Sequence, residues 1–233
     1  MDKFADHFLD SCAIIGKIIE FDVHYNCAEI YFKKKYNKHT SKRVEFEVRN
    51  RINGLRRELL SFLNWIKTKN FKGYATSTNV MGFLNKYHYH DREKNYRTLN
   101  RFFSLNMSEI ISYLIDRKDV TIDNLKTCVL SSISKADNKL IDLFHPSQSQ
   151  IICHSTPQNY TVSLNAEYTS INNLINYEPD VLILLDSFYL KTNVLKKDIG
   201  FITTDYSDIL SKADDITSKL PGVHIFDMRT VKT

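Results

Sequence analysis

The clearest pattern of hydrophobic and polar positions lies between residues 44 and 66. Apolar residues recur there at steps of three and four, namely Val44, Val48, Ile52, Leu55, Leu59, Phe62, Leu63 and Ile66. This spacing predicts one long amphipathic helix, with Ser41 as its N-cap and its end near Trp65. The stretch from Lys38 to Lys42 is polar throughout, which predicts a break before that helix.

Short apolar runs elsewhere predict buried strands, and two of them end in an acid. Phe8 and Leu9 lead into Asp10, and residues 200–204 lead into Asp205. Further strands are expected at 150–153 and 223–226, and further helices at 11–21, 22–36 and 164–177 and from Glu178 onward. Capping a helix is the commonest role of an Asp in such a place, so Asp10 alone assigns no function.

The middle of the chain is predicted to be mostly helical. Residues 71–79 have the composition of a loop, and helices are expected over 80–89, 94–117 and 120–144. His145-Pro146 should end the last of them. We therefore expect a single domain over residues 1–233, with residues 70–150 as a helical insertion or subdomain within it.

Length and composition are typical of a globular α/β protein. The chain has 233 residues, of which 42% are hydrophobic and 25% charged. No apolar run approaches the roughly 20 residues that span a bilayer, and the first residues lack a secretory pattern, so we expect no membrane partner. The four cysteines form no CxxC pair, and a reduced, cytoplasmic protein is expected.

Positive charge is concentrated in one part of the sequence. Ten Lys and Arg residues against two acids lie between Lys33 and Arg57, and a second basic stretch with interleaved Tyr runs from Lys86 to Arg101. Such clusters suit a phosphate backbone, although a solvated helix face has the same composition. The candidate nucleic-acid-binding residues are Lys34, Lys35, Lys42, Arg43 and Arg49.

Acidic residues occupy the ends of the predicted strands and the starts of two helices. They are Asp10, Glu45, Glu47, Asp180, Asp205 and Asp208. If the strands are parallel neighbours, these carboxylates meet at one edge and repel one another unless a cation lies among them. An all-oxygen set favours Mg²⁺ or Mn²⁺, which can activate water for phosphodiester hydrolysis. The helical wheel places Glu45 nearer the buried stripe than Glu47, so geometry leaves the choice between them open.

Four segments resemble, in order, the motifs of the PIN-domain family. Residues 8–16 are similar to its opening strand and turn, in which an apolar pair precedes an Asp and a hydroxyl residue. Residues 41–48 are similar to the second motif, in which a Ser precedes the acid by six positions. By that spacing the family's acid falls on Glu47, with Glu45 as the alternative.

The remaining two motifs resemble the end of the chain. Asp180 opens an apolar helix, as in the third motif, and residues 201–205 resemble the fourth, with Asp208 in a secondary acidic position. The sequence departs from the family pattern at Ser11-Cys12, where Thr-Asn is usual, and in a longer, more helical stretch over 50–150. Ser11 keeps a hydroxyl beside the expected metal.

The resemblance implies a PIN-like three-layer α/β/α sandwich with a mostly parallel central sheet. It also implies an Mg²⁺- or Mn²⁺-dependent endoribonuclease that cleaves single-stranded RNA, or less often DNA, either as a toxin held by an antitoxin or in RNA processing. Asp10, Glu47, Asp180 and Asp205 would be catalytic and would bind the metal with Asp208, while Ser11 and Thr204 would orient ligands or water. Nucleases of this size often form homodimers.

Two other functions are compatible with the same residues. One is a PIN-like nucleic-acid-binding or scaffold protein with little catalytic activity, which would bind RNA without metal-dependent cleavage. The other is a small-molecule phosphatase or a response-regulator-like acidic pocket. The second is disfavoured because no Lys follows a strand near the last acid.

Overall fold

The computed structural model describes residues 4–68, 82, 86, 102–104, 122–145 and 150–231. Two compact units are distinguished: residues 1–49 with 140–233, and residues 50–139. The loop predicted at 71–79, most of the helices predicted at 80–89 and 94–117, and the second basic stretch lie outside the described residues. The predicted insertion at 70–150 is therefore described only in part.

A parallel five-stranded sheet forms the centre of the first unit. Its strand order is β3-β2-β1-β4-β5, and the strands are β1 (Asp6–Leu9), β2 (Asn37–Ser41), β3 (Ile152–His154), β4 (Ile199–Thr203) and β5 (Val223–Asp227). The chain runs outward from β1 through β2 to β3 and then returns to the other side of β1, so the winding reverses between β1 and β4. In open parallel sheets, ligands bind at the carboxyl ends of the strands at such a reversal.

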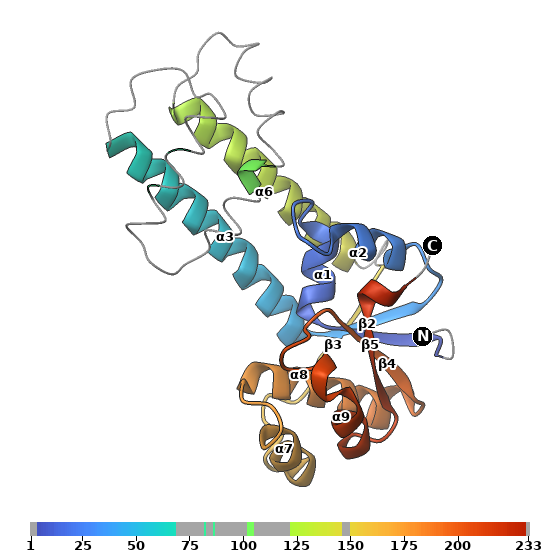
Figure 1. Cartoon of the computed structure of the whole chain (residues 1–233). Coiled ribbons are helices and arrows are strands. Elements are labelled where there is room, and N and C mark those ends of the chain that lie inside the picture. The colour runs from blue at the N-terminus through green and yellow to red at the C-terminus, as the bar shows by residue number, and fades with distance from the viewer. Residues whose placement is uncertain are drawn as a thin grey trace. The chain divides into compact units, whose positions relative to one another are not determined.

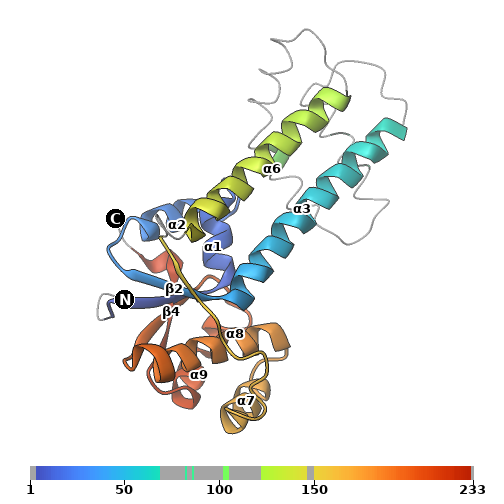
Figure 2. The same cartoon turned by 180° about the vertical axis from the view of Figure 1, so that it is seen from behind.

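Helices cover both faces of the sheet. Helices α1 and α2 lie on one face, and α7, α8 and α9 lie on the other (Figures 1 and 2). Their bounds are α1 (Ser11–Ile18), α2 (Tyr25–Phe32), α7 (Asn165–Asn172), α8 (Glu178–Tyr189) and α9 (Ala213–Lys219), with the short helices η1 (Leu190–Leu195), η2 (Leu210–Lys212) and η3 (Met228–Thr230). This arrangement confirms the predicted α/β fold class and a layered α/β/α architecture.

Two central strands supply much of the core. All four residues of β1 and all five of β4 are buried. Phe8 pairs with Phe201 in the parallel register, and their ring centroids are 5.7 Å apart in a stacked arrangement. Because side chains alternate along a strand, Asp10 and Thr203 follow these two rings on the same face of the sheet.

Strand β2 shows that the polar break predicted at Lys38–Lys42 was wrong. Four of its five residues are buried, and their polar groups find partners inside the protein. Lys38 Nζ donates to the carbonyls of Lys34 (2.9 Å) and Tyr36 (3.2 Å), and Thr40 Oγ1 donates to Leu9 O (2.9 Å). A polar sequence can therefore form an inner strand here, because burial of a polar group costs little once it is hydrogen-bonded.

Most predicted helices are present, although several are shorter than expected. The long amphipathic helix is α3 (Lys42–Thr68), and Ser41 Oγ accepts the N–H of Val44 (3.3 Å), as an N-cap does. Helices α1, α2 and α7 end before the predicted positions, and α9 was not predicted. Pro179 lies in the first turn of α8, where its missing N–H has no helical partner to lose.

The second unit contains a pair of helical segments. They are residues 50–68 of α3 and residues 122–139 of α6 (Ile122–Phe144). Ion pairs join Arg56 to Asp137 and Lys67 to Asp123 (3.2 Å), so the two segments run antiparallel. This unit has its own buried apolar residues, including Leu59, Phe62, Phe103, Leu125 and Val129.

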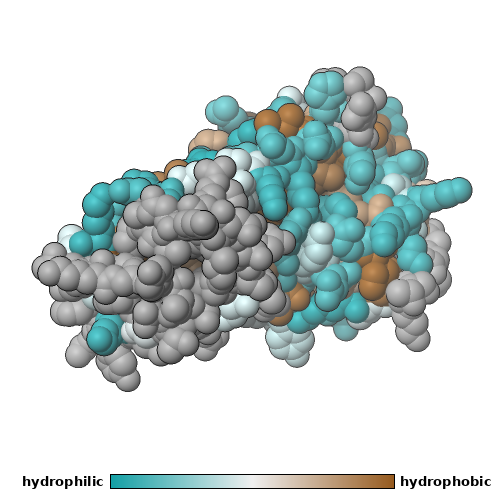
Figure 3. All heavy atoms as spheres, turned by 90° about the horizontal axis from the view of Figure 1, so that it is seen from above, coloured by the Kyte–Doolittle hydropathy of each residue, from teal (hydrophilic) through white to brown (hydrophobic). Residues whose placement is uncertain are grey.

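Hydrophilic residues dominate the described part of the face shown in Figure 3. On the face shown in Figure 3, hydrophobic residues of the described part occur in small groups between hydrophilic ones. Among the described residues, no helix has the length and apolar character that crossing a membrane requires.

Candidate metal centre at the carboxyl edge of the sheet

Asp10 lies at the carboxyl end of β1, at the winding reversal. Its backbone N–H continues the ladder to β4 by donating to Ile202 O (3.1 Å). Its carboxylate caps α1 by accepting the N–H of Ser11 (2.6 Å), and its other oxygen accepts the hydroxyl of Thr203 (2.8 Å). Asp10 thus has the predicted capping role, and the same bonds fix its carboxylate between two strands.

The loop after β4 holds two further acids. Asp205 Oδ1 accepts the N–H of Asp208 (3.2 Å) and the hydroxyl of Ser207 (3.0 Å), which closes a tight turn. The N–H of Asp205 donates to Thr203 Oγ1 (3.0 Å). Thr203 therefore contacts both Asp10 and the turn that carries Asp205, and it couples the position of one acid to that of the other.

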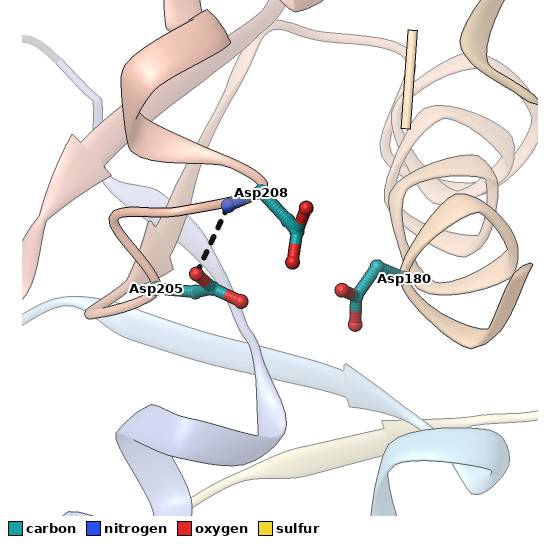
Figure 4. A group of neighbouring side chains, drawn as sticks. All are labelled: Asp180, Asp205 and Asp208. Carbon is teal, nitrogen blue, oxygen red and sulfur yellow. Dashed lines mark hydrogen bonds between the residues drawn. The ribbon is translucent and has the colours of Figure 1, made fainter. Parts of the chain in front are cut away.

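Asp180 approaches this loop from the first turn of α8. The carboxylates of Asp180, Asp205 and Asp208 point toward one another (Figure 4), and each offers an oxygen within 4.8 Å of the others. Burial raises the pKa of Asp180 to about 7, with further contributions from the charges of Asp10, Asp205, Glu47 and Asp208. The five acids predicted as metal ligands are thus electrostatic neighbours.

Asp10 is held in a similar electrostatic environment. Only 4% of the residue is exposed, and burial raises its pKa above the ordinary value. Hydrogen bonds from Cys12, Thr203 and the Ser11 N–H offset part of this effect, while the charge of Asp205 adds to it. A cation placed here would relieve both the repulsion and the burial cost.

Glu45 and Glu47 face different surroundings, although only one residue separates them. Glu45 is buried and accepts hydrogen bonds from Lys42 Nζ (2.7 Å) and Arg49 (2.7 Å), and these hydrogen bonds lower its pKa against the opposing effect of burial. Glu47 instead contributes to the field at Asp180. Burial of Glu45 agrees with its place on the helical wheel, yet it is Glu47 that lies near the acidic cluster.

Cys12 and Thr203 are contacts of the site that sequence reasoning did not include. Cys12 Sγ donates to Asp10 (3.0 Å) and accepts the N–H of Thr204 (3.1 Å). The hydroxyl on Asp10 belongs to Thr203, whereas Thr204, the predicted orienting residue, contributes its backbone N–H. Ser11 likewise contributes its N–H. The alternation of side chains along β4 could have pointed to Thr203. It does so only once the register between β1 and β4 is known.

The candidate nucleic-acid-binding residues do not form one rim around the acids. Lys34 and Lys35 precede β2, at the edge where the strands begin, roughly 15 Å of strand from the edge where the acids lie. Lys42 and Arg49 pair with Glu45. Arg43 pairs with Asp186 (3.3 Å) and donates to the carbonyl of Pro157 (3.1 Å).

The partner of Arg43, Asp186, is a buried acid that needs a counter-charge. This acid is fully buried in α8, and burial raises its pKa. Besides Arg43, it accepts the hydroxyl of Tyr160 (2.8 Å). Arg43 therefore acts here as a structural counter-ion.

The donor set fits a hard divalent cation. Asp180, Asp205 and Asp208 offer only carboxylate oxygens at mutual distances that a single ion can bridge, with Asp10 and Glu47 as neighbours. Mg²⁺ and Mn²⁺ prefer such ligands, whereas Zn²⁺ and Cu²⁺ sites are commonly built with His or Cys. Cys12 is half-buried beside Asp10, and its pKa is raised well above the ordinary value by burial and by that charge, so it is held as a neutral thiol.

Comparison with protein-family models, curated proteins and solved structures gives no match to this chain.

Proposed function

We propose that this chain is an Mg²⁺- or Mn²⁺-dependent nuclease that cleaves single-stranded RNA. The main support is the convergence of Asp10, Asp180, Asp205 and Asp208, with Glu47 beside them, at the carboxyl edge of a parallel sheet where its winding reverses. The PIN-like order of the sequence motifs is independent support.

In this proposal, Asp180, Asp205 and Asp208 would bind the cation directly. Asp10 and Glu47 would add negative charge beside it. A bound divalent ion would supply an activated water and would stabilise negative charge on the attacked phosphate. The protein's own part is positioning. Thr203 and the Ser11 N–H hold Asp10, and the turn closed by Ser207 and the Asp208 N–H holds Asp205.

The decisive experiment measures cleavage of a single-stranded RNA with Mn²⁺ by wild type and by Asp10→Asn. Asp214→Asn is the matched control, because Asp214 is an exposed acid on α9. We expect cleavage by wild type and by the control, loss of cleavage in Asp10→Asn, and loss in wild type when EDTA is added. Equal activity of Asp10→Asn and wild type would contradict the proposal.

Calorimetric titration with Mn²⁺ provides a readout that does not depend on catalysis. Wild type and Asp214→Asn should bind the ion with equal affinity, and Asp180→Asn should bind it more weakly. RNA binding by a wild-type protein that neither binds Mn²⁺ nor cleaves would instead favour the nucleic-acid-binding or scaffold alternative.

A further inference from the structure

Exposed aromatic side chains occur beside the acidic cluster. Among the large hydrophobic residues exposed in the described parts of the chain, the aromatic ones are Phe46, Tyr177 and Tyr206, with exposed fractions of 66%, 55% and 67%. The others are aliphatic. Each ring neighbours an acid in the sequence: Phe46 directly precedes Glu47, Tyr177 lies three residues before Asp180, and Tyr206 directly follows Asp205.

Backbone geometry keeps these rings close to the cluster. Consecutive Cα atoms are about 3.8 Å apart, and one helical turn rises about 5.4 Å. The backbone positions of each ring and its acid are therefore no more than about one helical turn apart. The N–H of Asp180 donates to Tyr177 O (3.1 Å), which fixes that separation for one pair. Three elements thus each bring one acid and one ring to the same edge of the sheet.

An exposed ring is unfavourable in the free protein, because apolar surface stays in contact with water. Isolated exposed residues are common on protein surfaces, but in the described part of the chain the exposed aromatic ones all lie within three residues of an acid of the cluster. The cations first assigned to the RNA backbone are paired with protein groups or lie at the other edge of the sheet. Aromatic faces are therefore a surface that these three segments offer to a substrate.

We propose that Phe46, Tyr177 and Tyr206 are stacking platforms for the unpaired bases of a single-stranded nucleic acid whose phosphate lies at the acidic cluster. Each base has a π-face, so stacking of this kind binds a single strand with little sequence preference. Bases inside a duplex are already stacked on one another and cannot use such platforms. This inference rests on the proposed function for the position of the phosphate, while stacking itself needs no cleavage.

The test separates stacking from hydrophobic contact by changing the ring alone. Phe46→Leu and Tyr206→Leu keep a large apolar side chain without an aromatic face, whereas Phe46→Tyr and Tyr206→Phe keep the face. Val194→Ala is the control for an exposed apolar residue away from the acids, because Val194 (46% exposed) precedes β4 at the opposite edge. All variants are made in the Asp10→Asn background, so the probe stays intact.

The probe is a fluorescent single-stranded RNA, and its dissociation constant is measured by anisotropy. Each Leu variant should weaken binding roughly 5- to 150-fold, the range that stacking on one base corresponds to. The Phe46→Tyr, Tyr206→Phe and Val194→Ala variants should bind as the Asp10→Asn parent does. An abasic strand of the same length should bind weakly to the parent and no more weakly to the Leu variants.

Two outcomes would overturn the inference. Unchanged RNA affinity in a variant with all three rings replaced by Leu would do so, and it would favour a protein partner for these side chains. An equal loss of affinity for the abasic strand would also do so, because the rings would then act through the phosphates or the fold. If wild type cleaves RNA in either case, the proposed function stands without the stacking platforms.

Discussion

The two ends of strand β1 each carry a buried aspartate, and their surroundings have opposite effects. At the amino end, burial alone would raise the pKa of Asp6, but hydrogen bonds from Lys197, His39 and Asn37 outweigh it and lower the pKa below its ordinary value. At the carboxyl end, burial raises the pKa of Asp10, and the nearby charge of Asp205 raises it further.

This difference separates an aspartate that has a counter-charge within the protein from one that lies beside another acid. Asp6 has a counter-charge within the protein, Lys197 Nζ at 2.5 Å, and a hydrogen bond with the ring of His39 at 2.9 Å. Asp10 receives hydrogen bonds from uncharged groups, and the charged neighbour that raises its pKa further is another acid, Asp205. Like charges collected at one edge raise the free energy of the folded state, and a bound cation would remove that cost.

The largest expected contrast between the two ends is in activity. Asp10→Asn should reduce Mn²⁺-dependent RNA cleavage more than about 100-fold, because even partners of metal ligands are commonly worth 10- to 100-fold. Asp6→Asn, corrected for the fraction of folded protein, should change cleavage by less than about threefold. Initial rates at saturating Mn²⁺ measure both. A comparable loss of cleavage in the two variants would contradict a catalytic role that is specific to the carboxyl end of β1.

Stability should show the opposite contrast. Asp6→Asn should lower the free energy of unfolding by about 2–3 kcal/mol, toward the low end for a broken buried pair because Lys197 is half-exposed. Asp10→Asn should cost less in metal-free protein, since it removes a buried charge that repels Asp205. Urea denaturation in EDTA provides both values. Greater destabilisation by Asp10→Asn would mean that the acidic edge stabilises the fold by itself.

A smaller effect is expected from the hydroxyl that positions Asp10. Thr203→Val should weaken Mn²⁺ binding about tenfold, because it removes the hydrogen bond to Asp10 Oδ2 and the one that holds the Asp205 turn. Thr204→Val is the matched control, because the backbone N–H of Thr204 makes its contact with Cys12. Equal losses in the two variants would argue against a specific role for Thr203.

The most gradual effect is on the pH dependence of stability. The lowered pKa of Asp6 gives stability that is present above its unfolded pKa of 3.8 and is lost as the pH falls below that value. The raised pKa of Asp180, about 7, has the opposite sign, so metal-free protein should lose stability as the pH rises from about 4 to 7. In urea midpoints measured across pH 3–8, Asp6→Asn should reduce the loss of stability at low pH, and Asp180→Asn should reduce the loss between pH 4 and 7.

The sequence predicted those elements whose signals are local. Residues close together in the sequence indicate the apolar stripe of α3, the buried strands β1 and β4, and the start of α8 at Pro179. All of these elements are present. The acids at the strand ends could be grouped because the carboxyl ends of parallel strands share one edge. These features needed no knowledge of which groups meet across the sheet.

The features that were missed depend on partners far away in the sequence. The polar sequence of β2 can be an inner strand because groups such as Leu9 O and Asp6 satisfy it, and no local pattern reveals them. The choice of Thr203 over Thr204 depends on the register between β1 and β4. The different surroundings of Glu45 and Glu47 depend on residues of β3 and α8: Cys153 contacts Glu45, and Asp180 lies near Glu47.

The short length of β1 has one more consequence. Its four residues begin at Asp6, which has a counter-charge within the protein, and lead directly into Asp10, which lies beside another acid. A strand is stiff and rises about 3.3 Å per residue, so it fixes the distance between the two. An added residue between Asp6 and Asp10 would turn one of the two toward the opposite face of the sheet. An insertion within β1 should therefore not be tolerated, and the length of this strand has to be kept in any redesign of the protein.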